Sequence, residues 1–299
     1  MSRFKTIGFV YFLSAFVPLV VAAEPQAADQ SQGYGPFGLL DHRSTYGTYW
    51  FPEPLRAGEM DVDREFRIDY FHGENQNSQE DEVTAELEWS FGLVTVELEV
   101  PYSRESESES DPIDGKIHHN TSDGIGNLEL AARAPIFEYV DPAGQFDYTL
   151  AAKLEVAIPS GSKISKDTEI VPAILNLIRI GDHFSIQASA GYSILIGPEE
   201  GGTNTLETDV IFGYLIDHNQ LALPGVVSTV PICELNNETA LSGESNGDNA
   251  LFGTIGARVN LESIGTIQPR VGLGYVFPID DGAKDEMDWG VVVSMVFEL

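Results

Sequence analysis

The stretch EVTAELEWSFGLVTVELEVPY, residues 82–102, alternates apolar and polar side chains on both sides of a glycine. Before Gly92, apolar side chains occupy every second position from Val83 to Phe91, with glutamate, threonine or serine between them. After Gly92 the pattern repeats as far as Tyr102. A period of two places the two kinds of side chain on opposite faces of a strand, whereas at helical period the glutamates would scatter around the cylinder. The stretch therefore predicts two long strands joined by a tight turn.

The same period of two recurs along most of the chain. Regular alternation continues at 124–136, 146–158, 184–196, 206–216, 267–277 and 288–299, and less regular strands fit at 65–72, 168–180, 219–235 and 250–261. The total is about 12 strands of mostly about 10–13 residues, whereas strands of globular proteins average about 5–6 residues. At about 3.3 Å per residue and a tilt of about 45°, such strands span about 25 Å, the height of the apolar band of an outer-membrane barrel.

The connections between these strands alternate between long and short. Long connections lie at 73–81, 103–123, 159–167, 197–205, 236–249 and 279–287. Most of the others are tight, namely Gly92, 181–183, 217–219 and 262–265, with 137–145 as the exception. Transmembrane barrels show this asymmetry, because their outer loops are long and their periplasmic turns are short. A soluble β-sandwich is the alternative, but it would not need charged residues opposite a full-length apolar row on nearly every strand.

We therefore predict an all-β fold, a transmembrane antiparallel up-and-down β-barrel of about 12 strands, over residues 61–299. The final strand, DWGVVVSMVFEL (288–299), has apolar side chains at every second position. We expect it to pair with the first strand near 65–72, so that no open sheet edge faces lipid.

Two segments precede the predicted barrel. Residues 1–23 start with two basic residues, continue with an uncharged apolar run, and end on Val21-Ala22-Ala23, which is the layout of a secretory signal peptide. A transmembrane anchor is the alternative, but the run is short for one and ends at a cleavage-like site. Residues 24–60 look irregular and start with a stretch rich in Gln, Gly and Pro. Such a segment either plugs the barrel, lies against it or stays in the periplasm as a linker, and the sequence leaves these alternatives open.

The composition limits the classes of function. With 47 acidic and 16 basic residues the chain carries a net charge of −31, which repels nucleic acid, so we expect no nucleic-acid partner. The single cysteine, Cys233, excludes an internal disulfide framework. A mean hydropathy of −0.08 is compatible with a membrane barrel, because only alternate residues of its strands face lipid. No Gly-rich phosphate loop, paired-Cys zinc spacing or H-E-x-x-H motif occurs, and we predict neither a cofactor nor a metal site.

The polar faces of the strands predict which residues line the lumen. The predicted pore-lining residues are Glu86, Glu88, Glu97, Glu99, Glu129, Arg133, Asp147, Lys153, Glu155, Arg179, Glu207, Asp209, Arg258 and Arg270. Acids outnumber bases about two to one on this face, so an open lumen would prefer cations or neutral polar solutes. Alternatively, these residues pair with one another and hold the barrel shut. A barrel of about 12 strands fits either a narrow channel or a plugged one.

Aromatic residues on the apolar faces gather near the strand ends. We expect them to form the two interfacial girdles of a barrel, in contact with outer-membrane lipid and lipopolysaccharide. The predicted girdle residues are Trp89, Tyr102, Tyr148, Tyr192, Tyr214, Tyr275, Trp289 and Phe297.

Two further functions are alternatives to a channel. The stretch HHNTSDG (118–124) brings His118, His119, Asn120 and Ser122 together, as a hydrolase on a barrel would require, although in a predicted outer loop. The acidic loops at 74–82, 104–115 and 280–288 would serve a closed barrel that acts as a scaffold or adhesin. They offer carboxylates to divalent cations, but none matches a calcium-loop pattern, and solvated surface loops are the simpler interpretation.

Three stretches resemble a known family. VELEVPYSRE (96–105), DGIGNLELAARAPI (123–136) and GLGYVFPIDDGAKDEMDWGVVVSMVFEL (272–299) are similar to an outer-membrane transporter family linked to meta-pathway phenol degradation. The resemblance covers about residues 60–299 and implies a barrel that takes up solute, but it supplies no binding residues. Barrels of this kind usually end in Phe, so the barrel-assembly machinery would read Phe297 and the alternating row more than Leu299.

The sequence thus predicts a protein of the bacterial outer membrane that passes a small solute passively and is not an enzyme. The remaining alternatives are a barrel-borne lipid or ester hydrolase and a closed barrel acting as scaffold or adhesin.

Overall fold

The computed structural model describes residues 51–58, 60, 64–91, 94–110, 117–141, 143–160, 167–197, 203–243 and 245–299. The chain over these residues is almost entirely β-structure. Its strands are β1 (Glu65–Glu74), β2 (Ser78–Phe91), β3 (Val94–Ser110), β4 (Ile117–Ile125), β5 (Leu128–Val140), β6 (Phe146–Ile158), β7 (Thr168–Ile180), β8 (Phe184–Ile196), β9 (Thr205–Tyr214), β10 (Ile216–Asp217), β11 (Val226–Ala240), β12 (Asn249–Leu261), β13 (Gln268–Pro278) and β14 (Trp289–Glu298). Two short helices, α2 (His218–Leu221) and α3 (Asp281–Glu286), lie in connections.

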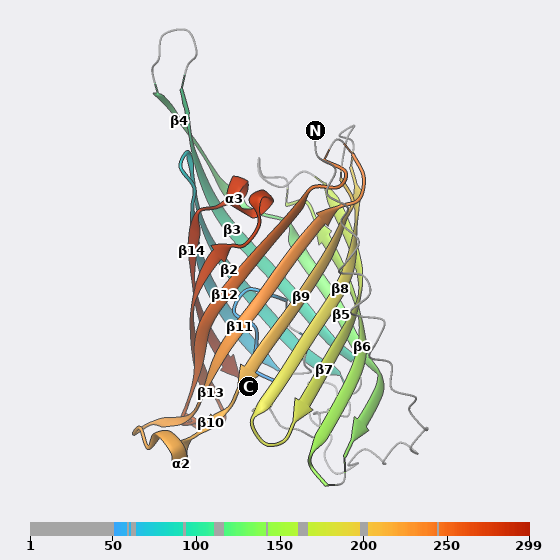
Figure 1. Ribbon diagram of the computed structural model, residues 1–299, viewed down its shortest axis with the longest axis vertical. Helices are drawn as coiled ribbons and strands as arrows, with labels where there is room; N and C mark the ends of the chain where they lie inside the picture. Colours follow the sequence, from blue (N-terminus) through green and yellow to red (C-terminus); the bar gives the residue numbers. More distant parts are fainter. Residues whose placement is uncertain are drawn as a thin grey trace.

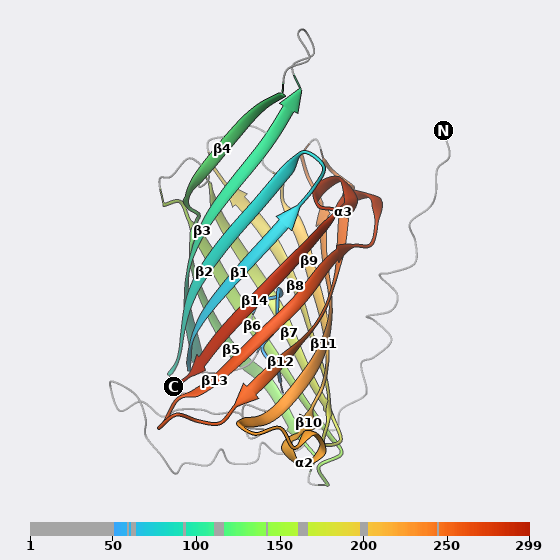
Figure 2. The ribbon, with the colours of Figure 1, turned by 90° about the vertical axis from the view of Figure 1, so that its left-hand side faces the viewer.

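The strands form one closed antiparallel barrel of 12 strands (Figures 1 and 2), which confirms the predicted fold. Each wall strand pairs with its neighbours in the chain, except that β4 and the two-residue β10 stand outside the wall order. The barrel closes where β1 pairs with β14, from Glu65 opposite Glu298 to Glu74 opposite Trp289. The predicted pairing of the last strand with the first is therefore confirmed, and no wall strand is left with an open edge.

The alternation in the sequence becomes an inside-out distribution of side chains. On β2, Val83 and Leu87 are exposed on the outer face, whereas Glu86 and Glu88 are buried in the interior. The adjacent strand β3 repeats this arrangement, because Leu98 is exposed and Glu97 is buried. A soluble protein of this size hides its apolar side chains. Here they cover the outside, as expected where hydrocarbon is the surrounding medium.

The two ends of the barrel differ. One end, called the turn end, carries the start of β1, the end of β14 and the connections at 92–93, 141–145, 181–183, 215–225 and 262–267. The other, called the loop end, carries the connections at 75–77, 111–116, 159–167, 197–204, 241–248 and 279–288. In the described part of the chain, no helix has the length and apolar character needed to cross a membrane.

Several element boundaries correct the sequence prediction. The predicted strand at 219–235 begins only at Val226, because α2 and a turn with Ala222 in the left-handed region precede it. The predicted long connection at 73–81 is a tight turn at 75–77, since β1 and β2 continue beyond the apolar row.

The predicted long loop at 103–123 is also largely β-structure. Within it β3 extends to Ser110 and pairs with β4, forming a hairpin that projects beyond the barrel (Figure 2). Its sequence is polar on both faces, so a period-two hydrophobic pattern could not reveal it.

Candidate functional site in the barrel lumen

The structure places the predicted pore-lining residues on the inner face of the wall. Those near the turn end are fully or almost fully buried, among them Arg133, Asp147, Arg258 and Arg270. Those nearer the loop end, such as Glu99, line an internal cavity. That these residues line a path for solute remains a prediction, because inward orientation alone does not show conduction.

A network of ion pairs runs along the inner face of the wall from β2 to β6. The guanidinium of Arg133, whose side chain is 2% exposed, binds the carboxylate of Glu88 and lies 2.8 Å from Glu97 Oε2. The ammonium of Lys153 lies 3.4 Å from Glu97 Oε1 and 2.9 Å from Glu155 Oε2. Neighbouring strands supply these groups at one level of the barrel, so the network ties four strands together from the inside.

Three acids at this height of the barrel lie close enough together to be considered as metal ligands. Ligand oxygens of Glu86, Glu88 and Glu97 all lie within 4.8 Å of one another. However, Arg133 binds two of these carboxylates, and Arg67 Nη1 lies 3.9 Å from Glu86 Oε2. Because two arginines and Lys153 already pair with the three acids, we interpret the cluster as an ion-pair network.

Further pairs lie near the turn end. Arg179 on β7 binds Asp147 on β6, and Arg270 Nη2 on β13 lies 2.5 Å from Glu298 Oε2 on β14. All four charges are inside the wall, and each pair bridges adjacent strands. These pairs match the alternative that lumen charges hold the barrel together, and at this end they leave little polar side chain free for a solute.

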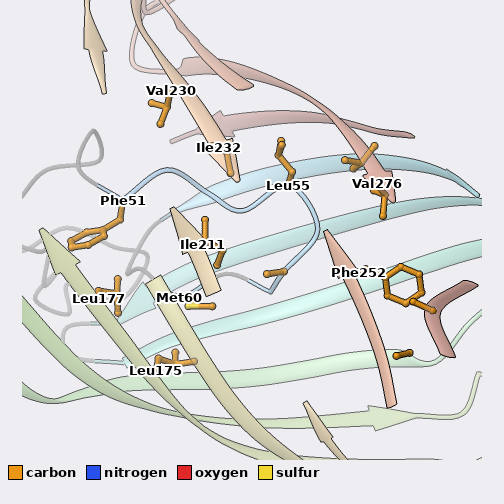
Figure 3. Packing of buried hydrophobic residues seen from close by; sticks show 14 of the residues in the cluster. Phe51, Leu55, Met60, Leu175, Leu177, Ile211, Val230, Ile232, Phe252 and Val276 are labelled. Carbon is orange, nitrogen blue, oxygen red and sulfur yellow. The ribbon is translucent and has the colours of Figure 1, made fainter. Parts of the chain in front are cut away.

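Residues 51–58 and 60, here called the inner segment, lie inside the barrel (Figure 3). The carbonyl of Pro52 accepts a hydrogen bond of 2.7 Å from Gln187 on β8, and the carbonyl of Pro54 accepts one of 2.9 Å from Arg67 on β1. Since β1 and β8 lie in different parts of the wall, the segment crosses the lumen. Residues 1–50, with the predicted signal peptide, lie outside the described residues.

Apolar side chains of the inner segment pack into one cluster with the wall (Figure 3). Phe51, Leu55 and Met60 are almost inaccessible to solvent. Their cluster partners are mostly inward-facing residues of β7, β9, β11, β12, β13 and β14, including Leu175, Leu177, Ile211, Val230, Ile232, Phe252, Val276 and Val292. An apolar core inside the barrel explains why the inner faces of these strands are less polar than those of β2 and β3.

Above the inner segment, towards the loop end, lies a cavity of about 410 Å³. Its floor includes Leu55, Arg56, Ala57 and Gly58. Its charged lining consists of Asp69, Glu80, Glu82, Glu86, Glu97, Glu99, Glu129, Glu155, Glu207 and Asp209, against Arg56, Arg67 and Lys153. With ten acids and three bases, the cavity is a strongly acidic compartment, more acidic than the sequence predicted for the lumen as a whole.

Several lumen residues were absent from the sequence prediction. Glu53 belongs to the irregular segment, and Glu80 lies beyond the predicted end of its strand. Glu234 shares its face of β11 with the apolar Val230 and Ile232, so the alternation does not mark it as a lumen residue. Arg67 lies on a strand with a weak apolar row. Extending the alternation past each apolar row would have recovered Glu80, but no local signal marks Glu53.

The predicted girdle residues lie on the outer face near the two ends of the wall. The pairing registers place Trp89, Tyr148, Tyr214 and Phe297 near the turn end, and Tyr102, Tyr192, Tyr275 and Trp289 near the loop end. Phe297 stacks against Phe66 across the closing pair of strands, with ring centroids 6.4 Å apart. This placement is the one that aromatic girdles require.

The candidate hydrolase residues His118, His119, Asn120 and Ser122 lie on β4. Ser122 pairs with Glu105 of β3, in the hairpin that projects from the barrel. The side chains of His118 and His119 are outside the described side chains. The proposed catalytic grouping therefore remains an untested alternative.

Comparisons with known proteins support the fold. No family model matches the chain, and no curated protein sequence matches it. The crystal structure of an outer membrane channel from Pseudomonas putida F1 superimposes with a TM-score of 0.55 at 13% identity, covering 82% of this chain and 99% of that one. A NanC porin gives a TM-score of 0.43 at 10% identity, covering 78% and 98% of the two chains. Outer membrane phospholipase A from Escherichia coli gives 0.31 at 10% identity, covering 80% and 97%. Of these three, the first has a TM-score above 0.5, and it shows the barrel fold.

Proposed function

We propose that this protein is an outer-membrane channel that passes small solutes passively. The observation that carries the proposal is the acidic cavity inside a closed barrel whose outer surface is apolar. A closed barrel satisfies all backbone hydrogen bonds of its wall, which is a requirement for crossing a bilayer with strands. Its structural similarity to an outer membrane channel supports the same interpretation.

The outer membrane is the proposed location. Exposed apolar side chains such as Leu87, Leu98 and Leu273 cover the wall between the two aromatic rows. Lipid and lipopolysaccharide would be the partners of this surface, and the barrel-assembly machinery would recognise β14. Delivery to that membrane would require the predicted signal peptide at residues 1–23.

The cavity supports a preference for cations or neutral polar solutes over anions. Ten carboxylates against three basic groups give the compartment a negative field, and rings of Asp and Glu select cations in known channels. Glu99 and Glu129 are directly opposite each other on β3 and β5, and each also faces further carboxylates across the cavity. The resemblance to the phenol-degradation family suggests small aromatic solutes as one class to test.

Conductance measurements test the channel proposal. Purified protein inserted into a planar bilayer with a salt gradient should produce discrete conductance steps and a reversal potential of the sign for cations. Folding is checked first, by the different electrophoretic migration of boiled and unboiled samples. A folded protein that stays silent, also when the inner segment is removed, would contradict a channel, and a reversal potential of anionic sign would contradict the selectivity.

A further inference from the structure

The inner segment is held at the turn end by one buried carboxylate. Glu53 binds Arg270 through its carboxylate, and Arg258 Nε lies 3.2 Å from Glu53 Oε2. Arg258 also donates hydrogen bonds to the carbonyls of Glu53 and Pro54, at 3.0 and 2.8 Å. Glu53, Arg258 and Arg270 are each at most 1% exposed. A charge so deeply buried is stable only while its partners remain in place.

A second anchor holds the middle of the segment. The carboxylate of Glu234 on β11 accepts hydrogen bonds from the backbone N–H groups of Leu55, Arg56 and Ala57. Three successive N–H groups aimed at one carboxylate fix the path of the backbone, because a chain in another conformation could not present them together. Glu234 is itself fully buried, so its charge is satisfied by the segment.

The side chains of Leu55 and Arg56 are fixed by packing against the wall rather than by an ion pair. The guanidinium carbon of Arg56 lies 5.1 Å from the ring centroid of Phe71 and 4.8 Å from that of Phe252, within cation–π range of both. Leu55 fills the space beside Gly256, Gly272 and Gly274, where a Cβ would meet its side chain. The wall thus provides a fitted groove of glycines for one leucine of the segment.

These contacts divide the lumen into two halves of different character. At the turn end, inward residues from separate strands, such as Ser90, Gln187 and Ser228, are almost fully buried. Open volume is found on the other side of the segment, where the cavity is bounded by Leu55, Arg56, Ala57 and Gly58. A solute that enters from the loop end would therefore meet the segment before it reached the turn end.

We propose that the inner segment is a plug that closes the lumen at the turn end, and that Glu53 is the latch that keeps it in place through Arg258 and Arg270. Passage through the barrel then requires release of the plug. The proposal rests on the channel function proposed above, and its experiment separates the two. It adds to that function a specific closing device and the residues that hold it.

The first test compares full-length wild-type protein with Glu53→Gln, which keeps the shape of the side chain and removes its charge. Conductance in planar bilayers should rise several-fold in the variant, approaching that of a variant that lacks residues 51–58. Glu262→Gln, which changes an exposed carboxylate at the same end, is the matched control and should resemble wild type. Equal and measurable conductance in wild type, Glu53→Gln and the deletion variant would overturn the plug.

A reversible tether tests the plug independently of the latch. Pro52 lies against Gly213 on β9, where a Cβ would come within 2.9 Å of the proline ring. In a Cys233→Ser background, Pro52→Cys with Gly213→Cys should form a disulfide that holds the segment in the lumen. Added to Glu53→Gln, it should restore low conductance when oxidised and lose that effect on reduction. If the oxidised, cross-linked protein conducts as well as Glu53→Gln without the cross-link, the proposal is overturned.

Trypsin gives a readout that does not depend on conduction. The peptide bond after Arg56 is inside the lumen in the latched protein, so it should be resistant in wild type and cut in folded Glu53→Gln, yielding a fragment that starts at Ala57. Silent but folded wild-type, Glu53→Gln and deletion proteins with this cleavage pattern would refute the channel and support the latch. Equal cleavage of wild type and Glu53→Gln would refute the latch, whatever the conductance.

Discussion

Single buried charges decide much of the chemistry of this barrel. Arg133 is the clearest example, because one guanidinium binds both Glu88 and Glu97 from two adjacent strands. The apolar cluster inside the barrel lies mostly against β7, β9 and β11 to β14, and it contributes little to the inner face of the wall between β2 and β6. Buried ion pairs therefore take the place of apolar packing between β2 and β6, and removal of one partner leaves the other charge without compensation.

Arg133→Met should destabilise the barrel strongly. The methionine fills part of the space but takes the guanidinium away from two buried carboxylates, of which Glu97 keeps Lys153 as a partner. Removing one partner of a buried ion pair typically costs about 3–5 kcal/mol. The free energy of unfolding, measured by urea titration in lipid vesicles, is the test. Arg104→Met on the exposed part of β3 is the control and should change it little. A loss for Arg133→Met no greater than that of the control would show that the network does not stabilise the barrel.

At the scale of elements, each wall strand is hydrogen-bonded to two neighbours. The projecting part of the β3–β4 hairpin and the helix α3 lie at the loop end, outside the wall. The hairpin of β3 and β4 extends beyond the wall, and β4 pairs with no strand other than β3. The helix α3 lies in the connection before β14 and is anchored by Asp280, its N-cap residue.

The projecting hairpin should be dispensable for folding. Replacing residues 109–118 by a short Gly-containing turn removes pairs between β3 and β4 but no pair between wall strands, because β2 pairs with β3 only as far as Glu107. The variant should show the same difference in migration between boiled and unboiled samples, and the same conductance. A misfolded variant would show that the hairpin contributes to closure of the barrel.

The capping of α3 should depend on pH. Partial burial opposes ionisation of Asp280, but hydrogen bonds from the N–H groups of Leu251 and Ala283 and from Asn249 outweigh it and hold the pKa of Asp280 below its ordinary value. A carboxyl with a lowered folded-state pKa stabilises the fold above its unfolded pKa and loses this contribution as pH falls through the folded value.

Asp280→Ala should therefore cost about 1 kcal/mol at neutral pH, the usual value of an N-cap, and progressively less below about pH 4. Unfolding titrations of wild type and variant at several pH values measure the difference, in which all other carboxyls cancel. Asp281→Ala, on the exposed side of α3, is the control. A penalty that is constant down to pH 2 would contradict the ionised cap.

At the scale of the whole molecule, charge is distributed unevenly around the lumen. Strands β1 to β9 supply the acidic wall of the cavity, whereas β11 to β14 supply most of the apolar partners and the two arginines that hold the inner segment. The field of the cavity is a sum over many carboxylates, so no single acid determines it.

Cation selectivity should therefore fall gradually as acids of the cavity are removed. Glu82→Gln with Asp209→Asn removes two of the ten acids of the cavity. In the Glu53→Gln background the reversal potential in a salt gradient should move towards zero, without reversing, because eight carboxylates remain against three bases. Glu138→Gln, outside the cavity lining, is the control. An unchanged reversal potential in the double variant would place the selectivity elsewhere in the barrel.

The sequence alone determined the wall of this protein. Alternation such as that from Val83 to Tyr102 specifies both the strand and the face of each residue, because a strand repeats every two residues whatever its partners are. The barrel class, its 12 strands and the pairing of the last strand with the first followed from strand length, spacing and the need to leave no open edge. The inward orientation of residues such as Glu97 and Arg270 followed from the same period.

Only the tertiary structure decided what fills the barrel. Glu53 meets Arg258 and Arg270 across about 200 residues of chain, and nothing in the local pattern of an irregular segment encodes such a contact. The partner of each inward charge likewise depends on the register between strands, which a single strand does not reveal. The sequence could therefore state that charges face the lumen, whereas the paired turn-end half and the acidic loop-end cavity emerged only from their arrangement in space.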